Sequence, residues 1–80
     1  MSGVAEICAR SKIQQLCQSY GIGWDRCSDA DRVQILRELQ RQMLDEAESS
    51  YNPRARDFCR RVANLYTNEL HQIELANRYK

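Results

Sequence analysis

The stretch Asn52–Tyr79, NPRARDFCRRVANLYTNELHQIELANRY, decides the fold that we expect for this chain. Asn52 is a suitable N-cap, and Pro53 fits the first helical position, where its missing N–H costs nothing. No other Gly or Pro follows, and apolar residues recur at spacings of three and four: Ala55, Phe58, Cys59, Val62, Leu65, Tyr66, Leu70, Ile73 and Ala76. This spacing predicts a long helix over 53–78 with one apolar face.

A second amphipathic helix, over 29–49, precedes that stretch. Ser28 is followed three residues later by Asp31, an acidic variant of the capping box. The apolar stripe of this helix consists of Val33, Leu36, Leu39, Met43 and Ala47, widened by Ile35 and Leu44. Because Ser and Asn favour turns and the residue before Pro avoids the helical region, residues 49–53 predict a tight turn. The two long helices should therefore lie antiparallel.

The first helix is expected over 4–19, capped by Ser2 or Gly3 and ended by Gly21 in the left-handed region. Its inner face should comprise Ala5, Cys8, Ala9, Ile13, Leu16, Cys17 and Tyr20. The loop that follows carries Trp24, which we expect to plug one end of the helices or to anchor a partner. The sequence thus predicts one all-α domain over 1–80, either a three-helix antiparallel bundle or a long helical hairpin with a short N-terminal helix.

The apolar stripes of the long helices are wider than a single seam. Ile35, Leu44, Leu75 and Tyr79 lie beside the main stripes, and a chain of this size buries a small share of its surface. The first helix covers these residues in one interpretation. In the other, a second copy or another protein covers them. We expect a homodimer.

Charge and hydropathy limit the partners that we expect. Twelve Lys and Arg face eleven Asp and Glu, for a net charge of +1, so no global field steers the chain to nucleic acid or to an anionic membrane. No apolar run approaches the roughly 20 residues that span a bilayer. The first residues lack the pattern of a secretory signal. The sequence therefore predicts a cytoplasmic protein without a membrane segment.

The residues that catalysis or metal binding requires are sparse. His71 is the single histidine and falls in the middle of a predicted helix, without groups that would orient it. No C-x-x-C pair indicates a zinc site, and Gly21 and Gly23 do not make a phosphate-binding loop because no strand precedes them. We therefore expect no enzymatic activity, no cofactor and no metal.

The four cysteines are Cys8, Cys17, Cys27 and Cys59. Three of them fall on apolar helix faces, where free cysteine behaves as a small hydrophobe. Cys27 differs because it lies in the loop, beside Arg26 and just before the N-cap of the second helix, and both features favour the thiolate. Cys27 is therefore a candidate redox residue, with a plain loop cysteine as the alternative.

Charge is segregated around the predicted turn. Asp45, Glu46 and Glu48 end the second helix, whereas Arg54, Arg56, Arg60 and Arg61 begin the third. Both clusters oppose the helix macrodipole. In one interpretation the turn brings them together and they neutralise each other, with Asp57 and Arg61 pairing locally. In the other, the arginines flank a helix N-terminus that attracts an anionic group of a partner.

The leading hypothesis from the sequence is a small non-enzymatic helical interaction module that docks on and modulates a larger protein. The candidate partner-binding residues are Trp24, Arg54, Arg56, Arg60 and Arg61. The alternative is a nucleic-acid-binding protein that uses the arginines at the start of the third helix. Asp57 within that cluster and the near-zero net charge disfavour the alternative.

Overall fold

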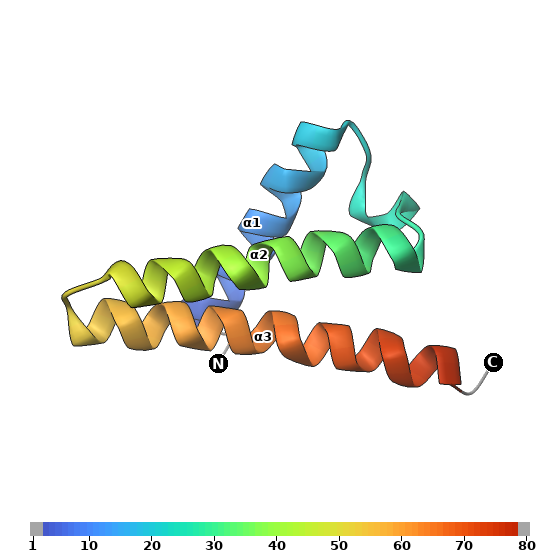
Figure 1. Ribbon diagram of the computed structural model, residues 1–80. Coiled ribbons are helices and arrows are strands. Elements are labelled where there is room, and N and C mark those ends of the chain that lie inside the picture. The colour runs from blue at the N-terminus through green and yellow to red at the C-terminus, as the bar shows by residue number, and fades with distance from the viewer. Residues whose placement is uncertain (1–2, 79–80) are drawn as a thin grey trace.

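The computed structural model describes residues 3–78, which are helical throughout except for short connections (Figure 1). The elements are α1 (Val4–Tyr20), the 3-10 turn η1 (Trp24–Arg26), α2 (Asp29–Ser49) and α3 (Pro53–Arg78). Within the described residues no strand occurs, so the all-α class is confirmed. The helix bounds agree with the sequence prediction to one residue. The expected roles of Ser2 and Tyr79 lie outside the described residues.

The helix ends form as the capping residues predict. The backbone N–H of Asp31 donates to Ser28 Oγ at 3.1 Å, and the N–H of Arg54 donates to Asn52 Oδ1 at 2.9 Å. Gly21 has φ 71° and ends α1. Its N–H bonds to the Gln18 carbonyl, and the next N–H bonds back to the Cys17 carbonyl, both at 3.1 Å. This paired geometry is a Schellman motif, which needs a left-handed residue that glycine supplies without strain.

α2 and α3 run side by side and antiparallel, and residues 50–52 connect them (Figure 1). Their facing stripes form most of the core. Leu36, Val62 and Tyr66 are the largest fully buried side chains. Among residues 3–78, the buried side chains are Ala9, Cys17, Cys27, Ile35, Leu36, Leu39, Met43, Ala47, Cys59, Val62, Ala63 and Tyr66. The 3.6-residue period of the sequence therefore located the centre of the core.

The margins of the predicted stripes need correction. Ile35 is buried, although the sequence placed it at the edge, and Ala63 is buried although the stripe omitted it. Ala55 and Ala76 are exposed. Ala55 lies in the first turn of α3, and Ala76 lies near the end of this helix, which is five residues longer than α2 (26 against 21). A helix longer than its partner leaves the end of its apolar face uncovered.

Tyr20 is the clearest error on the predicted inner face of α1. Its side chain is 54% exposed, and its hydroxyl donates to the Glu38 carboxylate on α2 at 2.9 Å. This hydrogen bond, with the charge of Glu38 second, raises the pKa of Tyr20. At the last residue of α1, the side chain of Tyr20 is open to solvent, and its hydroxyl is already hydrogen-bonded to Glu38. The ring can therefore stay exposed.

α1 crosses the hairpin instead of lying along it (Figure 1). It contacts both α3 and α2, and its N-terminal half is tied to α3 by the Tyr66 hydroxyl, which donates to the Ala9 carbonyl at 3.1 Å. This arrangement is the predicted long hairpin with a short N-terminal helix. Part of the surplus apolar surface is covered, since Ile35 is buried in one cluster with Ala9 and Cys17 of α1, while Leu44 stays 45% exposed.

We predict that Leu36→Ala and Leu44→Ala differ sharply in stability. Leu36 is fully buried, so its truncation should lower the free energy of unfolding by about 2–5 kcal/mol. Leu44 lies on the same helix but is 45% exposed, so its truncation should cost less than about 1 kcal/mol. Chemical denaturation of the two variants measures the difference. Equal losses would contradict the burial of Leu36 and the exposure of Leu44 described above.

Candidate partner-binding groove

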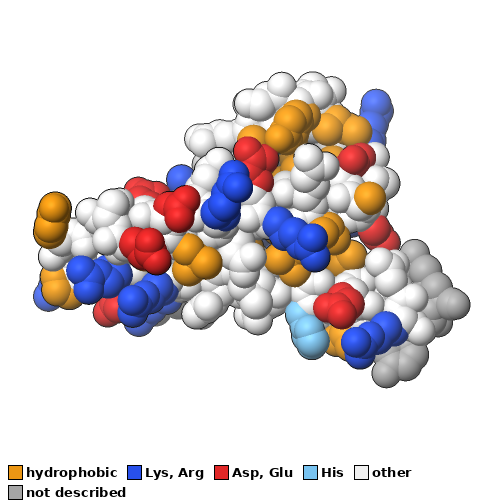
Figure 2. Space-filling model, viewed as in Figure 1, with side chains coloured by type: hydrophobic (Ala, Val, Ile, Leu, Met, Phe, Trp, Pro, Cys, Tyr) orange, Lys and Arg blue, Asp and Glu red, His pale blue; other side chains and the backbone are white. Residues whose placement is uncertain are grey.

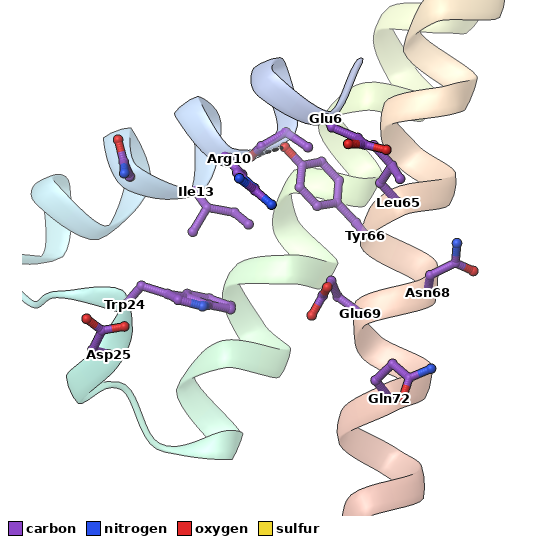
Figure 3. Close-up of a pocket in the computed structure, with 12 residues that line it drawn as sticks. Glu6, Arg10, Ile13, Trp24, Asp25, Leu65, Tyr66, Asn68, Glu69 and Gln72 are labelled. Carbon is purple, nitrogen blue, oxygen red and sulfur yellow. Dashed lines mark hydrogen bonds between the residues drawn. The ribbon is translucent and has the colours of Figure 1, made fainter. Parts of the chain in front are cut away.

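A groove of about 850 Å³ opens between α1, η1 and α3 (Figure 3). Its apolar part is made by Ala9, Ile13, Trp24, Leu65 and Tyr66. Its polar part is made by Glu6, Arg10, Gln14, Asp25, Asn68, Glu69 and Gln72. The groove is open to solvent and not an enclosed cavity. The groove is therefore accessible from solution.

The groove exists because of the path of the chain between α1 and α2. α1 rises away from the hairpin, and Gly21 then reverses the backbone so that η1 returns towards the start of α2 (Figure 1). α1 and η1 thereby form one side of the groove, while residues 65–72 of α3 form the other. Helices packed in parallel would have closed this space with side chains.

Arg32 holds Trp24 at the edge of the groove. Its guanidinium donates from Nε and Nη2 to the Trp24 carbonyl at 3.2 and 3.0 Å, and it lies 5.0 Å from the centre of the Trp24 ring. The indole is only half-buried, and its ring projects into the groove from η1 (Figure 3). Trp24 thus packs against the core with one part of its surface and leaves another part exposed in the groove.

The rim of the groove is acidic. The lining contains three carboxylates, Glu6, Asp25 and Glu69, and one cationic side chain, Arg10. All four side chains are exposed. The carboxylate of Glu69 extends from α3 towards the side of the groove that carries Trp24 (Figure 3). The whole chain has a net charge of +1, so this negative excess is local. Sequence reasoning missed it because the three acids come from distant segments that no periodicity connects.

The arginine cluster occupies a different place from Trp24. Arg54, Arg56, Arg60 and Arg61 lie in the first turns of α3, at the end of the hairpin, whereas Trp24 lies before the start of α2 (Figure 1). Arg54, Arg60 and Arg61 are exposed. Arg56 is half-buried, and its Nη2 donates to the carbonyl of Ser50, the C-cap of α2, at 2.9 Å. The structure does not bring the five predicted partner-binding residues into one site.

Acidic and basic side chains gather side by side at the end of the hairpin where α2 meets α3 (Figure 2). Nevertheless, within residues 3–78 no salt bridge joins the acids of α2 to these arginines, and none joins Asp57 to Arg61. Farther along α3, Glu74 forms an ion pair with Arg78 at 3.6 Å. The two clusters still attract each other, but exposed charges that form no salt bridge contribute little to the free energy of unfolding.

Cys27 is part of the core, in contrast to the loop thiol that the sequence suggested. It is 8% exposed, and its Sγ donates to the Gly23 carbonyl at 3.4 Å. Burial first, and the neighbouring Cys27 second, raise the pKa of Cys17. Cys27 follows η1 directly and belongs to the core cluster that also contains Cys17 of α1, so a thiol near Arg26 in sequence points inwards. Proximity in sequence to a cation therefore did not predict exposure.

The structure also places the histidine and the groups that could bind a metal. His71 is exposed on α3. Among the described residues, no three His, Cys, Asp or Glu side chains come together as a metal site would require. None of the helices described combines the length and apolar character needed to cross a bilayer.

Comparison with protein-family models, with curated proteins and with solved structures finds no match. The function is therefore inferred from the groove and its chemistry alone. By fold, the chain is an all-helical protein in which an N-terminal helix crosses a long helical hairpin.

We predict that Arg32→Met frees Trp24. The variant keeps an apolar stem but loses two hydrogen bonds and the ring contact, so the fluorescence anisotropy of this single Trp should fall. The free energy of unfolding should drop by about 1–3 kcal/mol. The matched control is Arg37→Met, an exposed position on the same helix, which should change neither value. Identical behaviour of the two variants would contradict the anchoring role of Arg32.

Proposed function

We propose that this chain is a small non-enzymatic interaction module that docks on a larger protein and modulates it. It does so by holding a basic, amphipathic helix of that protein in the groove between α1, η1 and α3. The observation that supports this proposal most is the pairing of an apolar floor with an acidic rim. Grooves of this kind accept helices through apolar anchors spaced along one face.

Each part of the groove suits one part of such a helix. Ile13, Trp24 and Leu65 are half-buried and line the floor, so an apolar helix face would complete their burial. Tryptophan is enriched among the residues that contribute most to binding. Lys or Arg beside that apolar face would meet Glu6, Asp25 and Glu69 on the rim. Such complementarity favours fast association and selects against acidic partners.

The second candidate function is nucleic-acid binding through the start of α3. Arg54, Arg60 and Arg61 are exposed and have no salt bridge in the part of the chain that the structure describes. Two observations weigh against this candidate. Acidic side chains share the same end of the hairpin (Figure 2), and Arg56 is engaged by the Ser50 carbonyl. A steep loss of affinity with salt would favour nucleic acid.

We also propose that the chain self-associates and that it is located in the cytoplasm. The exposed Leu44 on α2 and the exposed Val4 and Ile7 on α1 are apolar surface that a second copy would cover. Sedimentation at micromolar concentration measures this directly. A dimer mass supports self-association, and a monomer mass leaves the groove as the sole docking surface that we propose.

Trp24 is the single tryptophan and reports on the groove. We predict that a Leu/Lys amphipathic helical peptide shifts its emission to shorter wavelength and saturates, whereas a Leu/Glu peptide of the same length does not. The variant Glu6→Lys/Glu69→Lys should weaken the Leu/Lys peptide about tenfold or more and should admit the Leu/Glu peptide.

The control for this charge reversal is Asp45→Lys/Glu48→Lys. Both residues are exposed on α2 and lie outside the groove, while the change in net charge is the same. Affinity for the Leu/Lys peptide should stay within about twofold of wild type if the rim acts locally. If both variants lower the affinity for the Leu/Lys peptide equally, the effect comes from net charge. That result would contradict the groove as the helix-binding site.

A further inference from the structure

The α2–α3 turn, residues 50–52, carries the most exposed large apolar side chain among the described residues. Tyr51 is 99% exposed. The two other tyrosines that the structure describes both have partners, since Tyr20 donates to Glu38 and Tyr66 donates to the Ala9 carbonyl. Tyrosine is enriched among the residues that contribute most to binding. The fold does not use the ring of Tyr51, which is therefore available to a partner.

Hydrogen bonds hold the backbone on both sides of Tyr51. Asn52 Oδ1 accepts from the Arg54 N–H, and the Ser50 carbonyl accepts from Arg56 Nη2, both at 2.9 Å. The Ser50 hydroxyl donates to the Asn52 carbonyl at 3.4 Å. The turn therefore presents Tyr51 in a fixed place, and a tyrosine side chain has few torsions to order on binding.

Positive charge lies beside Tyr51 on α3. Arg54, Arg60 and Arg61 are exposed, and none of them forms a salt bridge in the described part of the chain. Asp57 is the one acid among these arginines, and the other acids at this end of the hairpin belong to α2. The α3 side of the turn therefore combines an apolar anchor with a net positive charge.

The groove between α1, η1 and α3 has the complementary chemistry, but it lies away from this turn. Its floor leaves Trp24 half-buried, and its rim carries more carboxylates than cations. About 18 Å of helix separates Pro53 from Leu65, the first residue of α3 that lines the groove. The turn lies at the far end of the hairpin (Figure 1). A single copy therefore cannot place Tyr51 in its own groove, and contact between the two surfaces requires two copies.

We propose that the groove of one copy receives the α2–α3 turn of a second copy, with Tyr51 against Trp24 and the exposed arginines of α3 facing the acidic rim. The inference rests on the proposed function, because it assigns a second occupant to the same groove. A copy bound in this way blocks the groove against the helix of the larger protein. This contact is separate from self-association through the exposed apolar residues of α1 and α2.

The contact joins two different surfaces of the same chain. Each pair of copies keeps one unused turn and one unused groove, so assembly continues beyond a dimer as the protein concentration rises. Because the turn must leave before a helix can bind, the apparent affinity for a helical peptide should fall at high protein concentration. Self-association thereby regulates access to the groove.

Two variants isolate this contact from any other self-association. The acceptor, Tyr51→Ala, keeps the groove and Trp24 but has lost the anchor of its own turn. The donor, Trp24→Phe/Glu69→Lys, keeps the turn, contains no tryptophan and has an altered groove. We expect the donor to shift the Trp24 emission of the acceptor to shorter wavelength until the signal saturates, because the ring of Tyr51 replaces water beside the indole.

Three further changes to the donor serve as controls. Adding Tyr51→Ala should abolish the shift. Adding Arg54→Gln/Arg61→Gln should weaken the affinity about tenfold or more, since two charges leave the contact. The matched change on α2, Arg37→Gln/Arg41→Gln, removes two exposed arginines outside the turn and should keep the affinity within about twofold. Circular dichroism checks that each variant is folded.

Sedimentation of the wild-type protein gives a second measurement if the donor does not fold. Its mass should rise beyond that of a dimer with concentration, and Tyr51→Ala should remove this rise. The proposal is overturned by a folded donor that leaves the emission of the acceptor unchanged, or by a shift that persists when the donor also carries Tyr51→Ala. Equal growth in mass of the wild type and Tyr51→Ala would overturn it as well.

The Leu/Lys peptide separates this inference from the proposed function. A peptide that saturates the Trp24 emission should also return the assemblies to smaller masses. If it binds and leaves the assemblies intact, the contact between copies lies elsewhere and only this inference fails. If the donor binds the acceptor through Tyr51 but no Leu/Lys peptide binds, the contact between copies stands and the proposed function fails.

Discussion

The hydrogen bond from the Tyr66 hydroxyl to the Ala9 carbonyl is the contact on which the arrangement of this protein depends. Tyr66 is 1% exposed, and a buried phenol left without a partner would lose a substantial part of its solvation energy. The acceptor that satisfies it lies on α1, 57 residues away in sequence. Burial of this side chain in the hairpin therefore specifies where α1 must cross.

The groove follows from that crossing. A helix that is tied to α3 near Ala9 and then rises away from the hairpin must leave space beside residues 65–72 of α3. The Schellman motif at Gly21 returns the chain, and Arg32 fixes η1 against the side of this space. The Tyr66 hydrogen bond, the left-handed conformation of Gly21 and the contacts of Arg32 together position the elements that line the groove.

The two ends of the hairpin offer different chemistry. The groove near the start of α2 combines apolar residues with an excess of carboxylates. The opposite end carries mixed charges and Tyr51, which is 99% exposed. The sequence drew attention to the second end, because arginines adjacent in a chain are easily seen. The first end is the better-formed site, since its walls come from three elements and its floor is half-buried.

Local physics made the helices predictable, and long-range packing made the site hard to predict. Ser28, Asn52 and Gly21 acted as their side chains or backbone freedom dictate, and the period of three and four located Leu36, Val62 and Tyr66 in the core. Apolar periodicity cannot reveal a crossing angle. It could not separate the buried Tyr66 from the exposed Tyr20.

The most direct test of the groove is site-specific photocrosslinking in the cells that produce the protein. A photoreactive residue replaces Gln72, on the rim of the groove, and in a second variant it replaces Asn52, at the turn between α2 and α3. The groove hypothesis predicts a crosslink from position 72 to a partner segment with Lys or Arg beside an apolar helical face, and none to that segment from position 52. A partner crosslinked only from position 52, or an acidic segment captured at position 72, would contradict it.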